Sequence, residues 1–374
     1  MPRGDNCPRC GLPRSLNRKL VWTTDGGIYF RSKRSERLVF IEEEEISALI
    51  GEGLRLRGEQ LLDTLRECRR VFTRDEVASQ LHGARRFILR RWPLARRVVR
   101  AALKEAAFFG CGSIEVSRIR PGKELVAKVR HPYHPHLLAG DIWGFWEGLY
   151  GVEALLSLSA SSGQEWDISV RTVGKGRLKP DRARPPRRPE RDYELEVCEK
   201  CRLPLFPWEL RWDPELGTIY QSGTHRHMLV TSARGWQQVV DEIAGTNEGN
   251  LPQSMGVSLA AVAAEEYRVL KGDNYKTAYR HFFLSLPFLG WGKPKRVSRK
   301  PFLIEAEMEG VLFPELLAWK IAGVYEALER ETADISRQQA GNGGWKYLVG
   351  PRLDGTFLPI ERMLPERGRT VLPF

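Results

Sequence analysis

The chain carries one short motif twice, and this repetition limits its folds more than any other feature. A Cys-x-x-Cys-x-Leu-Pro sequence begins at Cys7 and again at Cys198, 191 residues later. The same separation relates the glycine turns at Gly26 and Gly217, each followed by a short apolar run. Glycine between alternating apolar residues is typical of a β-hairpin, so each motif is predicted to lead into a hairpin.

A second pair of matching segments lies further along each copy. Segment 109–112 (Phe-Gly-Cys-Gly) matches segment 289–292 (Leu-Gly-Trp-Gly), and segment 134–149 matches segment 313–328. The separation is smaller here because the first copy is longer in its middle. Since the matches keep their order at both ends, we interpret the chain as an internal duplication.

The coarse pattern of each copy predicts a hairpin, helices, antiparallel strands, a long helix and a closing strand. In the first copy we expect that long helix over about 137–156. The predicted fold class is therefore mixed α/β (α+β), with two antiparallel-sheet-plus-helices domains that form a pseudo-dimer, each preceded by a Cys-x-x-Cys hairpin. The predicted boundaries are 1–40 for hairpin 1, 41–173 for domain 1, 174–197 for a basic Pro-rich linker, 198–231 for hairpin 2 and 232–374 for domain 2.

The segment from 109 to 149 carries a family resemblance. Its Gly-x-Gly turn, two strands and Leu-Leu-Ala-Gly…Gly-Phe-x-Glu-Gly-Leu helix resemble the 4-vinyl-reductase domain of bacterial hydrocarbon-binding proteins, a relative of TRAPP subunits; 289–328 is a weaker match. The resemblance implies a small apolar molecule held between helices and sheet. Sensors of this family also carry a metal-binding cysteine cluster after the last helix, whereas segment 157–162 contains no cysteine.

The two Cys-x-x-Cys pairs are the clearest candidate ligands for a metal. Two thiolates on a tight turn supply half of a tetrahedral zinc site, and a closed structural site needs four. A pseudo-two-fold axis would bring the equivalent turns together, so we predict one zinc ion on Cys7, Cys10, Cys198 and Cys201. Three alternatives stay open: one zinc per pair with local His or Asp ligands, a redox pair, and unliganded pairs.

Aromatic side chains gather on the long helix of each copy. They are candidates for the wall of an apolar ligand pocket, and equally for ordinary core or a contact between the repeats. The candidates are Trp143, Trp146, Tyr150, Trp319 and Tyr325.

The net charge of +12 is concentrated in the linker and in segment 85–100. Arginines with interleaved aromatics suit nucleic acid, an anionic membrane or an acidic protein partner, although such a face is often merely solvated. This basic patch consists of Arg85, Arg86, Arg90, Arg91, Arg96, Arg97 and Arg100.

Three histidines, His131, His134 and His136, lie within six residues of one another. They are candidates for a metal site, for polar contacts at a pocket mouth, or for a plain loop. Glu147 and Glu326 occupy equivalent positions in the two copies, and a repeated carboxylate is as easily structural as catalytic. We assign no catalytic residues, because the chain lacks a phosphate loop, a nucleophile elbow and a His-Glu-x-x-His motif.

Composition sets the broad class of protein. With 42% hydrophobic and 28% charged residues, the 374-residue chain is typical of globular proteins. It has no apolar run long enough to span a bilayer, and its polar start is unlike a signal peptide. We therefore expect a cytoplasmic, non-enzymatic binding or regulatory protein for an apolar small molecule, with a scaffold or nucleic-acid-associated protein as the alternative.

Overall fold

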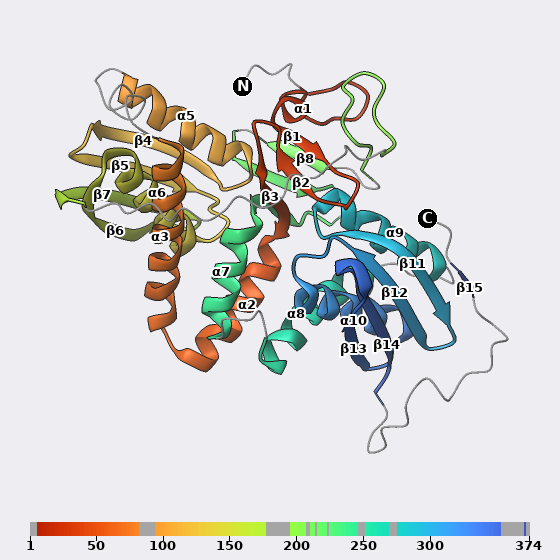
Figure 1. The fold of residues 1–374 in the computed structure, drawn as a ribbon. Coiled ribbons are helices and arrows are strands. Elements are labelled where there is room, and N and C mark those ends of the chain that lie inside the picture. Colours follow the sequence, from red (N-terminus) through yellow and green to blue (C-terminus); the bar gives the residue numbers. More distant parts are fainter. Residues whose placement is uncertain are drawn as a thin grey trace. The chain divides into compact units, whose positions relative to one another are not determined.

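The computed structural model describes residues 6–81, 94–176, 195–206, 210–213, 215–222, 224–245, 251–268, 275–352 and 370–371 (Figure 1). The described part is mixed α/β, with antiparallel sheets and nine α-helices. It divides into two compact units. Of the described residues, those between 41 and 176 and between 210 and 245 form the first unit, and those between 6 and 40, 195 and 206, 251 and 352, and 370 and 371 form the second.

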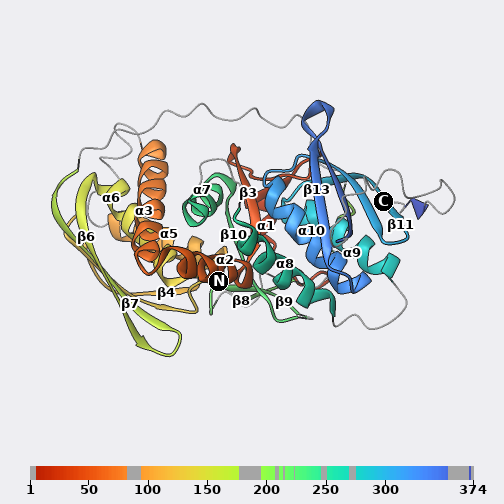
Figure 2. The same cartoon turned by 90° about the horizontal axis from the view of Figure 1, so that it is seen from below.

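The first unit is built on a four-stranded antiparallel sheet in the order β4-β5-β7-β6. Figure 2 shows α3 and α6 together on one side of strands β6 and β7. A second group of short strands, β8 to β10, leads into α7. The bounds are α2 Glu43–Arg57, α3 Gln60–Gln80, α5 Leu94–Phe108, β4 Ser113–Arg120, β5 Glu124–Arg130, α6 Pro135–Tyr150, β6 Val152–Ser162, β7 Glu165–Lys175, β8 Leu210–Asp213, β9 Thr218–Gln221, β10 His227–Ser232 and α7 Ala233–Ala244.

The second unit contains an antiparallel sheet in the order β13-β14-β12-β11-β15. Counted along the chain, strands β13, β14, β12 and β11 correspond to β6, β7, β5 and β4. The first four strands of this sheet therefore have the same order as the sheet of the first unit read from β6. Helix α10 occupies the place of α6 along the chain. The bounds are α1 Ser15–Lys19, β1 Leu20–Trp22, β2 Ile28–Phe30, β3 Lys33–Glu42, α8 Gln253–Arg268, α9 Tyr275–Leu289, β11 Lys293–Lys300, β12 Leu303–Glu309, α10 Pro314–Glu329, β13 Ala333–Gln339, the 3-10 turn Gly341–Gly343, β14 Trp345–Pro351 and β15 Thr370–Val371.

Each hairpin lies in the same compact unit as the main sheet from the other half of the chain. In the first unit, the indole of Trp212 on β8 donates to the carbonyl of Phe108 at 3.1 Å. In the second unit, the indole of Trp22 on β1 donates to the carbonyl of Phe288, also at 3.1 Å. Each hairpin thus completes the unit whose main sheet comes from the other half of the chain, an exchange that the predicted boundaries do not include.

The Gly-x-Gly turns explain how the hairpins approach so closely. A Cβ atom on Gly110 would lie 2.3 Å from the Met228 carbonyl oxygen, and one on Gly290 would lie 2.6 Å from that of Leu38. Both glycines also have positive φ, at 88° and 82°. Only glycine combines this conformation with the absence of a side chain, so these turns are fixed by tertiary contact.

The pairing of α3 with α6 depends on a glycine stripe. Gly140, Gly144 and Gly148 on α6 face the backbone of α3, and a Cβ on Gly144 would lie 2.2 Å from the carbonyl oxygen of Arg70. In the second unit, a Cβ on Gly323 would similarly lie 2.0 Å from the carbonyl oxygen of Ala260. Small residues at this spacing let two helix backbones approach more closely than usual.

Gly144→Ala is expected to destabilise the protein by about 1–3 kcal/mol, because the added methyl group must push the two helices apart. Urea denaturation followed by circular dichroism measures this change. The control is Gly51→Ala on α2, where nothing lies within 4 Å of an added Cβ. There we expect a gain of about 0.5–1 kcal/mol from helix propensity. Equal stability of the two variants would contradict the assigned packing.

The predicted helix over 137–156 is too long. Helix α6 ends at Tyr150, and Gly151 adopts the left-handed conformation, with φ 66°, that closes it. Residues after this cap belong to strand β6, which was not among the predicted strands. The described residues contain no helix that is long and apolar enough to cross a membrane.

Candidate metal centre

Each Cys-x-x-Cys motif forms the same tight turn. The amide of Cys7 donates to the carbonyl of Leu12 at 2.8 Å, and the amide of Gly11 donates to the carbonyl of Cys7 at 2.9 Å. The second motif repeats both bonds, from Cys198 to Leu203 at 2.8 Å and from Arg202 to Cys198 at 2.7 Å. Because the bonds match, both turns present their two thiols in the same way.

The four predicted ligands come together within the second unit. Cys7 Sγ lies 3.8 Å from Cys198 Sγ, and Cys10 Sγ lies 3.4 Å from Cys201 Sγ. All four sulfur atoms lie within 4.8 Å of one another. Sulfurs bound tetrahedrally to one ion, with bonds of about 2.3 Å, stand about 3.8 Å apart. The cluster therefore has the dimensions of a site that could hold one metal ion.

Burial closes this cluster to solvent. Cys7, Cys198 and Cys201 are buried and Cys10 is half-buried. The amide of Cys10 donates to the Cys7 thiol and lowers its pKa to about 6, while burial raises the pKa of Cys10. The amide of Cys201 likewise lowers the pKa of Cys198. The first thiol of each turn is thus the one best prepared to become a thiolate.

Contacts around the cluster join the two turns directly. Asn17 Nδ2, on α1, donates to the carbonyl of Cys201 at 3.1 Å. The Arg9 guanidinium forms an ion pair with Glu199 across the two turns. These contacts position the second turn against the first hairpin, although 191 residues separate Cys7 from Cys198.

The aromatic candidates of α6 contact strands β6 and β7 and helix α3. Trp146 is fully buried, donates to Thr172 Oγ1 at 3.1 Å and lies 4.5 Å from the Tyr150 ring. Trp143 donates to the Ala154 carbonyl at 3.0 Å, and the Arg70 guanidinium lies 4.4 Å from its ring centre. The structure thus brings Trp146 and Tyr150 together, and an apolar pocket in the first unit stays a prediction.

In the second unit the two aromatic candidates have different surroundings. Tyr325 is fully buried and its hydroxyl donates to the carbonyl of Phe302 at 3.0 Å. Trp319 is half-buried and faces α8, where its ring occupies the space beside Gly256. The ligand-wall role of both residues likewise stays a prediction.

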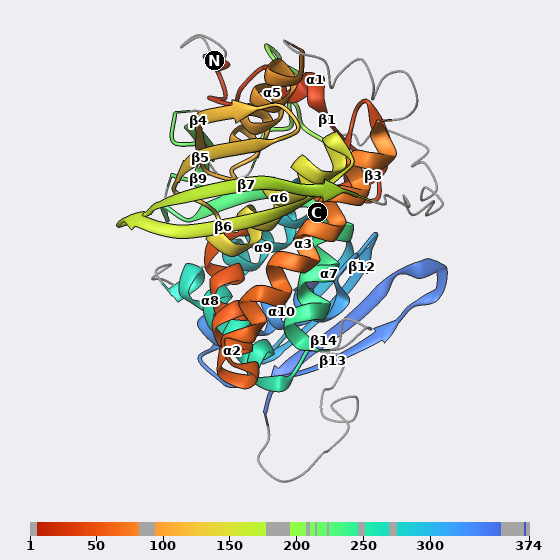
Figure 3. The same cartoon turned by 90° about the vertical axis from the view of Figure 1, so that its left-hand side faces the viewer.

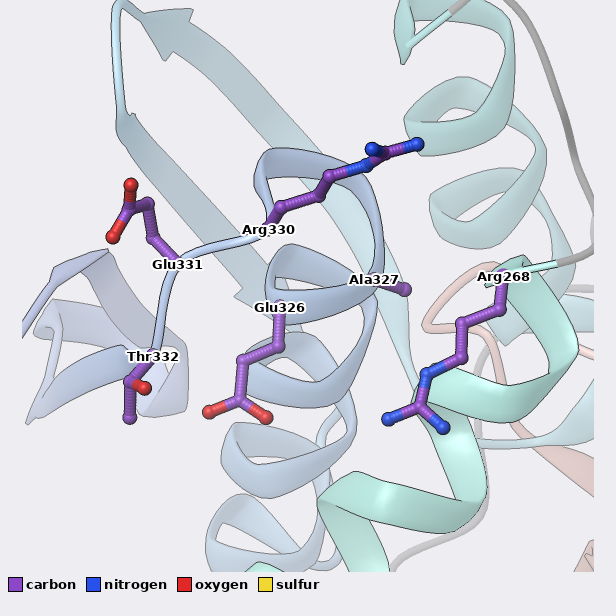
Figure 4. A pocket seen from close by; sticks show the side chains of 6 residues that line it. All are labelled: Arg268, Glu326, Ala327, Arg330, Glu331 and Thr332. Atoms are coloured by element: carbon purple, nitrogen blue, oxygen red, sulfur yellow. The ribbon is translucent and has the colours of Figure 1, made fainter.

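A polar cavity of about 440 Å³ lies in the second unit, near the C-terminal ends of α8 and α10 (Figure 4). Figure 4 shows Ala327 on the side of α10 that faces α8, with the Arg268 side chain extending from α8 toward α10. Glu326 Oε1 also accepts the amide of Ala333 at 3.0 Å. The residues that line the cavity are Arg268, Glu326, Ala327, Arg330, Glu331 and Thr332.

The repeated glutamates have one shared structural contact. Glu147 Oε1 accepts the amide of Ala154 at 2.9 Å, just as Glu326 accepts that of Ala333. The other oxygen of Glu147 accepts from Arg70 Nε at 2.9 Å. Both glutamates therefore tie the end of a long helix to the start of the next strand.

The first unit contains a polar network around Asp141 that the sequence did not predict. Asp141 Oδ1 accepts from Arg69 Nε at 2.9 Å and from Thr73 Oγ1 at 2.7 Å. Asp141 Oδ2 accepts from the hydroxyl of Tyr133 at 2.8 Å. Burial together with the nearby Asp141 charge raises the pKa of Tyr133. Arg69 and Thr73 lie 72 and 68 residues from Asp141 in the sequence, so no local pattern could have indicated these two bonds.

The histidine segment forms no metal cluster with other ligands among the described residues. The rings of His134 and His136 lie 5.8 Å apart, and the Nδ1 atoms of both are buried without a hydrogen-bond partner. The His131 ring instead contacts the side chain of Gln164. Burial, with His136 nearby, lowers the pKa of His134 to about 4.

This environment predicts an acid-sensitive contribution to stability. The unfolded His134 side chain takes up a proton near pH 6.5, whereas the folded one does so only near pH 4. The free energy of unfolding therefore keeps its full His134 contribution above pH 6.5, and it falls by about 3 kcal/mol as the pH drops to 4. In His134→Phe, which copies Phe313 of the other unit, the melting temperature should fall less over this range. His225→Asn, at an exposed histidine, is the control and should leave the wild-type pH profile unchanged.

Only part of the basic patch lies within the described residues. Arg96, Arg97 and Arg100 lie on α5, while Arg85, Arg86, Arg90 and Arg91 fall outside the described residues. Arg96 donates to the carbonyl of Ile119 at 3.2 Å, which gives it a structural contact. Arg97 and Arg100 are exposed, so the patch as a binding surface stays a prediction.

Comparison with known proteins adds no relative: no family model, curated protein or solved structure matches this chain. The geometry of the chain itself is therefore the ground for assigning a function.

Proposed function

We propose that this chain is a non-enzymatic, zinc-stabilised protein that binds a small molecule and acts as a sensor or regulatory component. The cluster of four cysteine thiols carries the proposal. Four thiolates in a closed tetrahedral arrangement favour zinc, and they leave no open coordination position for a substrate. The ion would thus hold the protein together, and its role would be structural.

The proposal includes an internal duplication. The same strand order, the same tryptophan-to-carbonyl bonds and the same glutamate-to-amide bonds occur in both units. Two copies related by a pseudo-two-fold axis account for this agreement, and they account for a site built from two equivalent turns. The resemblance to the 4-vinyl-reductase domain fits the same scheme.

The ligand-binding part of the proposal is supported by two features. The aromatic side chains of α6 and α10 supply apolar surface between helices and sheet, as the resemblance implies. The cavity beside Glu326 supplies room for a small molecule in the second unit. A ligand bound among the aromatic side chains would be apolar, and a ligand bound in the cavity beside Glu326 would be polar.

Native mass spectrometry of the full chain, before and after denaturation, tests this function. We expect one zinc ion per chain, identified by its mass, together with an organic mass that is lost on denaturation. Trp146→Leu and Glu326→Gln then distinguish the two ligand positions by which variant loses the organic mass. Two zinc ions per chain would overturn the shared site. A zinc-loaded protein that neither carries nor takes up an organic molecule would overturn the binding role.

A second candidate is a nucleic-acid-associated scaffold, favoured by the exposure of Arg97 and Arg100 on α5. It predicts binding to duplex or single-stranded nucleic acid that weakens steeply with salt. Arg97→Glu combined with Arg100→Glu should reduce both affinity and salt dependence. Arg55→Glu, on α2, is the control, because Arg55 already pairs with Glu52. Absence of binding at low salt would exclude this candidate.

A further inference from the structure

The sheet edges of the two units differ in how they are protected. Natural edge strands carry charges, are short, or are covered, because a free edge pairs readily with another strand. Edge strand β4 carries Glu115, Arg118 and Arg120, and β13 is seven residues long with Asp334 and Arg337. Strand β11 is covered by the short strand β15. The edges at β4, β13 and β11 therefore each show a recognised form of edge protection.

Strand β6 has none of these forms of protection along its centre. It is eleven residues long, and the stretch from Ala154 to Ser162 contains no charged residue and no proline. Among the described residues it pairs with β7 alone, and the pairing is regular from Ala154 to Ala160. Figure 3 shows this strand at the border of its sheet.

The side chains of β6 add to this picture. Leu155 is 61% exposed, and Val173 on the neighbouring strand β7 is 57% exposed. Ser157 and Ser159 are exposed on the same face, while Leu156 and Leu158 on the other face are half-buried. An additional strand beside β6 would cover these leucines and satisfy the outward backbone groups.

We infer that β6 is a self-association edge, which pairs antiparallel with β6 of a second copy of this chain. A two-fold axis through Ser157 places Leu156 opposite Leu158 and Glu153 opposite Ser161. No like charges then face each other, and the strand is complementary to itself. The paired sheets would form one continuous eight-stranded sheet, and this inference is independent of the proposed zinc and ligand.

Sedimentation equilibrium of the full chain tests the inference. We expect a monomer–dimer equilibrium at micromolar concentration, weakened about tenfold or more in a Ser157→Lys, Ser159→Lys variant by like-charge repulsion across the axis. The matched control is Ser336→Lys with Gln338→Lys, at the equivalent exposed positions of β13. This control should keep the wild-type dimer.

Hydrogen exchange supplies a readout that needs no variant. Amide protection in residues 152–162 should rise with protein concentration, while that of 333–339 should not. A wild-type chain that stays monomeric at high concentration would overturn the inference, as would a dimer that the β6 lysines leave unchanged. A strand donated by another protein would also give a monomeric pure chain, and it counts among the contradicting outcomes.

Discussion

Cys198→Ser is expected to abolish stoichiometric metal binding and to lower stability by about 5 kcal/mol, because structural zinc supplies folding energy directly. For a unit of this size, such a loss corresponds to a fall of roughly 10–20 °C in melting temperature. The effect is large because the buried ligands join chain segments that are distant in sequence. Metal analysis of the purified protein and a thermal melt measure both quantities.

Cys68→Ser is the matched control for this experiment. Cys68 lies on α3 of the first unit, outside the cluster, and burial raises its pKa to about 11. This variant should keep its full metal content, and a strong chelator should destabilise it as it does the wild type. An unchanged metal content in Cys198→Ser, or a loss in Cys68→Ser, would contradict the four-thiolate site.

Division of the chain within the predicted linker, at 185/186, should give two halves that fold only together. The first unit needs strands β8 to β10 from the second half, and the second unit needs strands β1 to β3 from the first half. The indole bonds of Trp212 and Trp22 each join the two halves within one unit. We therefore expect each half alone to be unfolded or insoluble.

Co-expression with an affinity tag on one half measures this complementation. The untagged half should co-purify in a one-to-one complex, and the complex should carry one metal ion because each half supplies two thiols. Co-expression with a Cys201→Ser second half should lower both the metal content and the yield. A first half that melts cooperatively by itself would show that the exchanged hairpin is dispensable.

Several local features could be predicted from the sequence. The spacing of the cysteines indicated two equivalent turns, and their duplication indicated that the turns would meet. The glycines at 26 and 217 marked the hairpin bends, and the structure has them there. These predictions succeed because they depend on residue types within a few positions of each other, such as glycine in turns with positive φ.

For other features the local signal was weak or absent. The helix predicted over 137–156 includes the first five residues of strand β6, because Leu155 and Leu156 continue the apolar spacing of α6 and only the Gly151 cap interrupts it. The network around Asp141 joins residues from α3, α6 and the loop between β5 and α6. In both places tertiary contacts outweigh the local pattern.

The sequence by itself determined the local elements of this protein: two Cys-x-x-Cys turns, two hairpins, and antiparallel strands on either side of a long helix. Only the tertiary structure decided which hairpin completes which unit. Both halves offer the same tryptophan donor, the same carbonyl acceptor and the same Gly-x-Gly turn, so local chemistry cannot distinguish pairing within a half from exchange between halves. The choice depends on packing of the whole chain, which sums contacts between residues that lie far apart in the sequence.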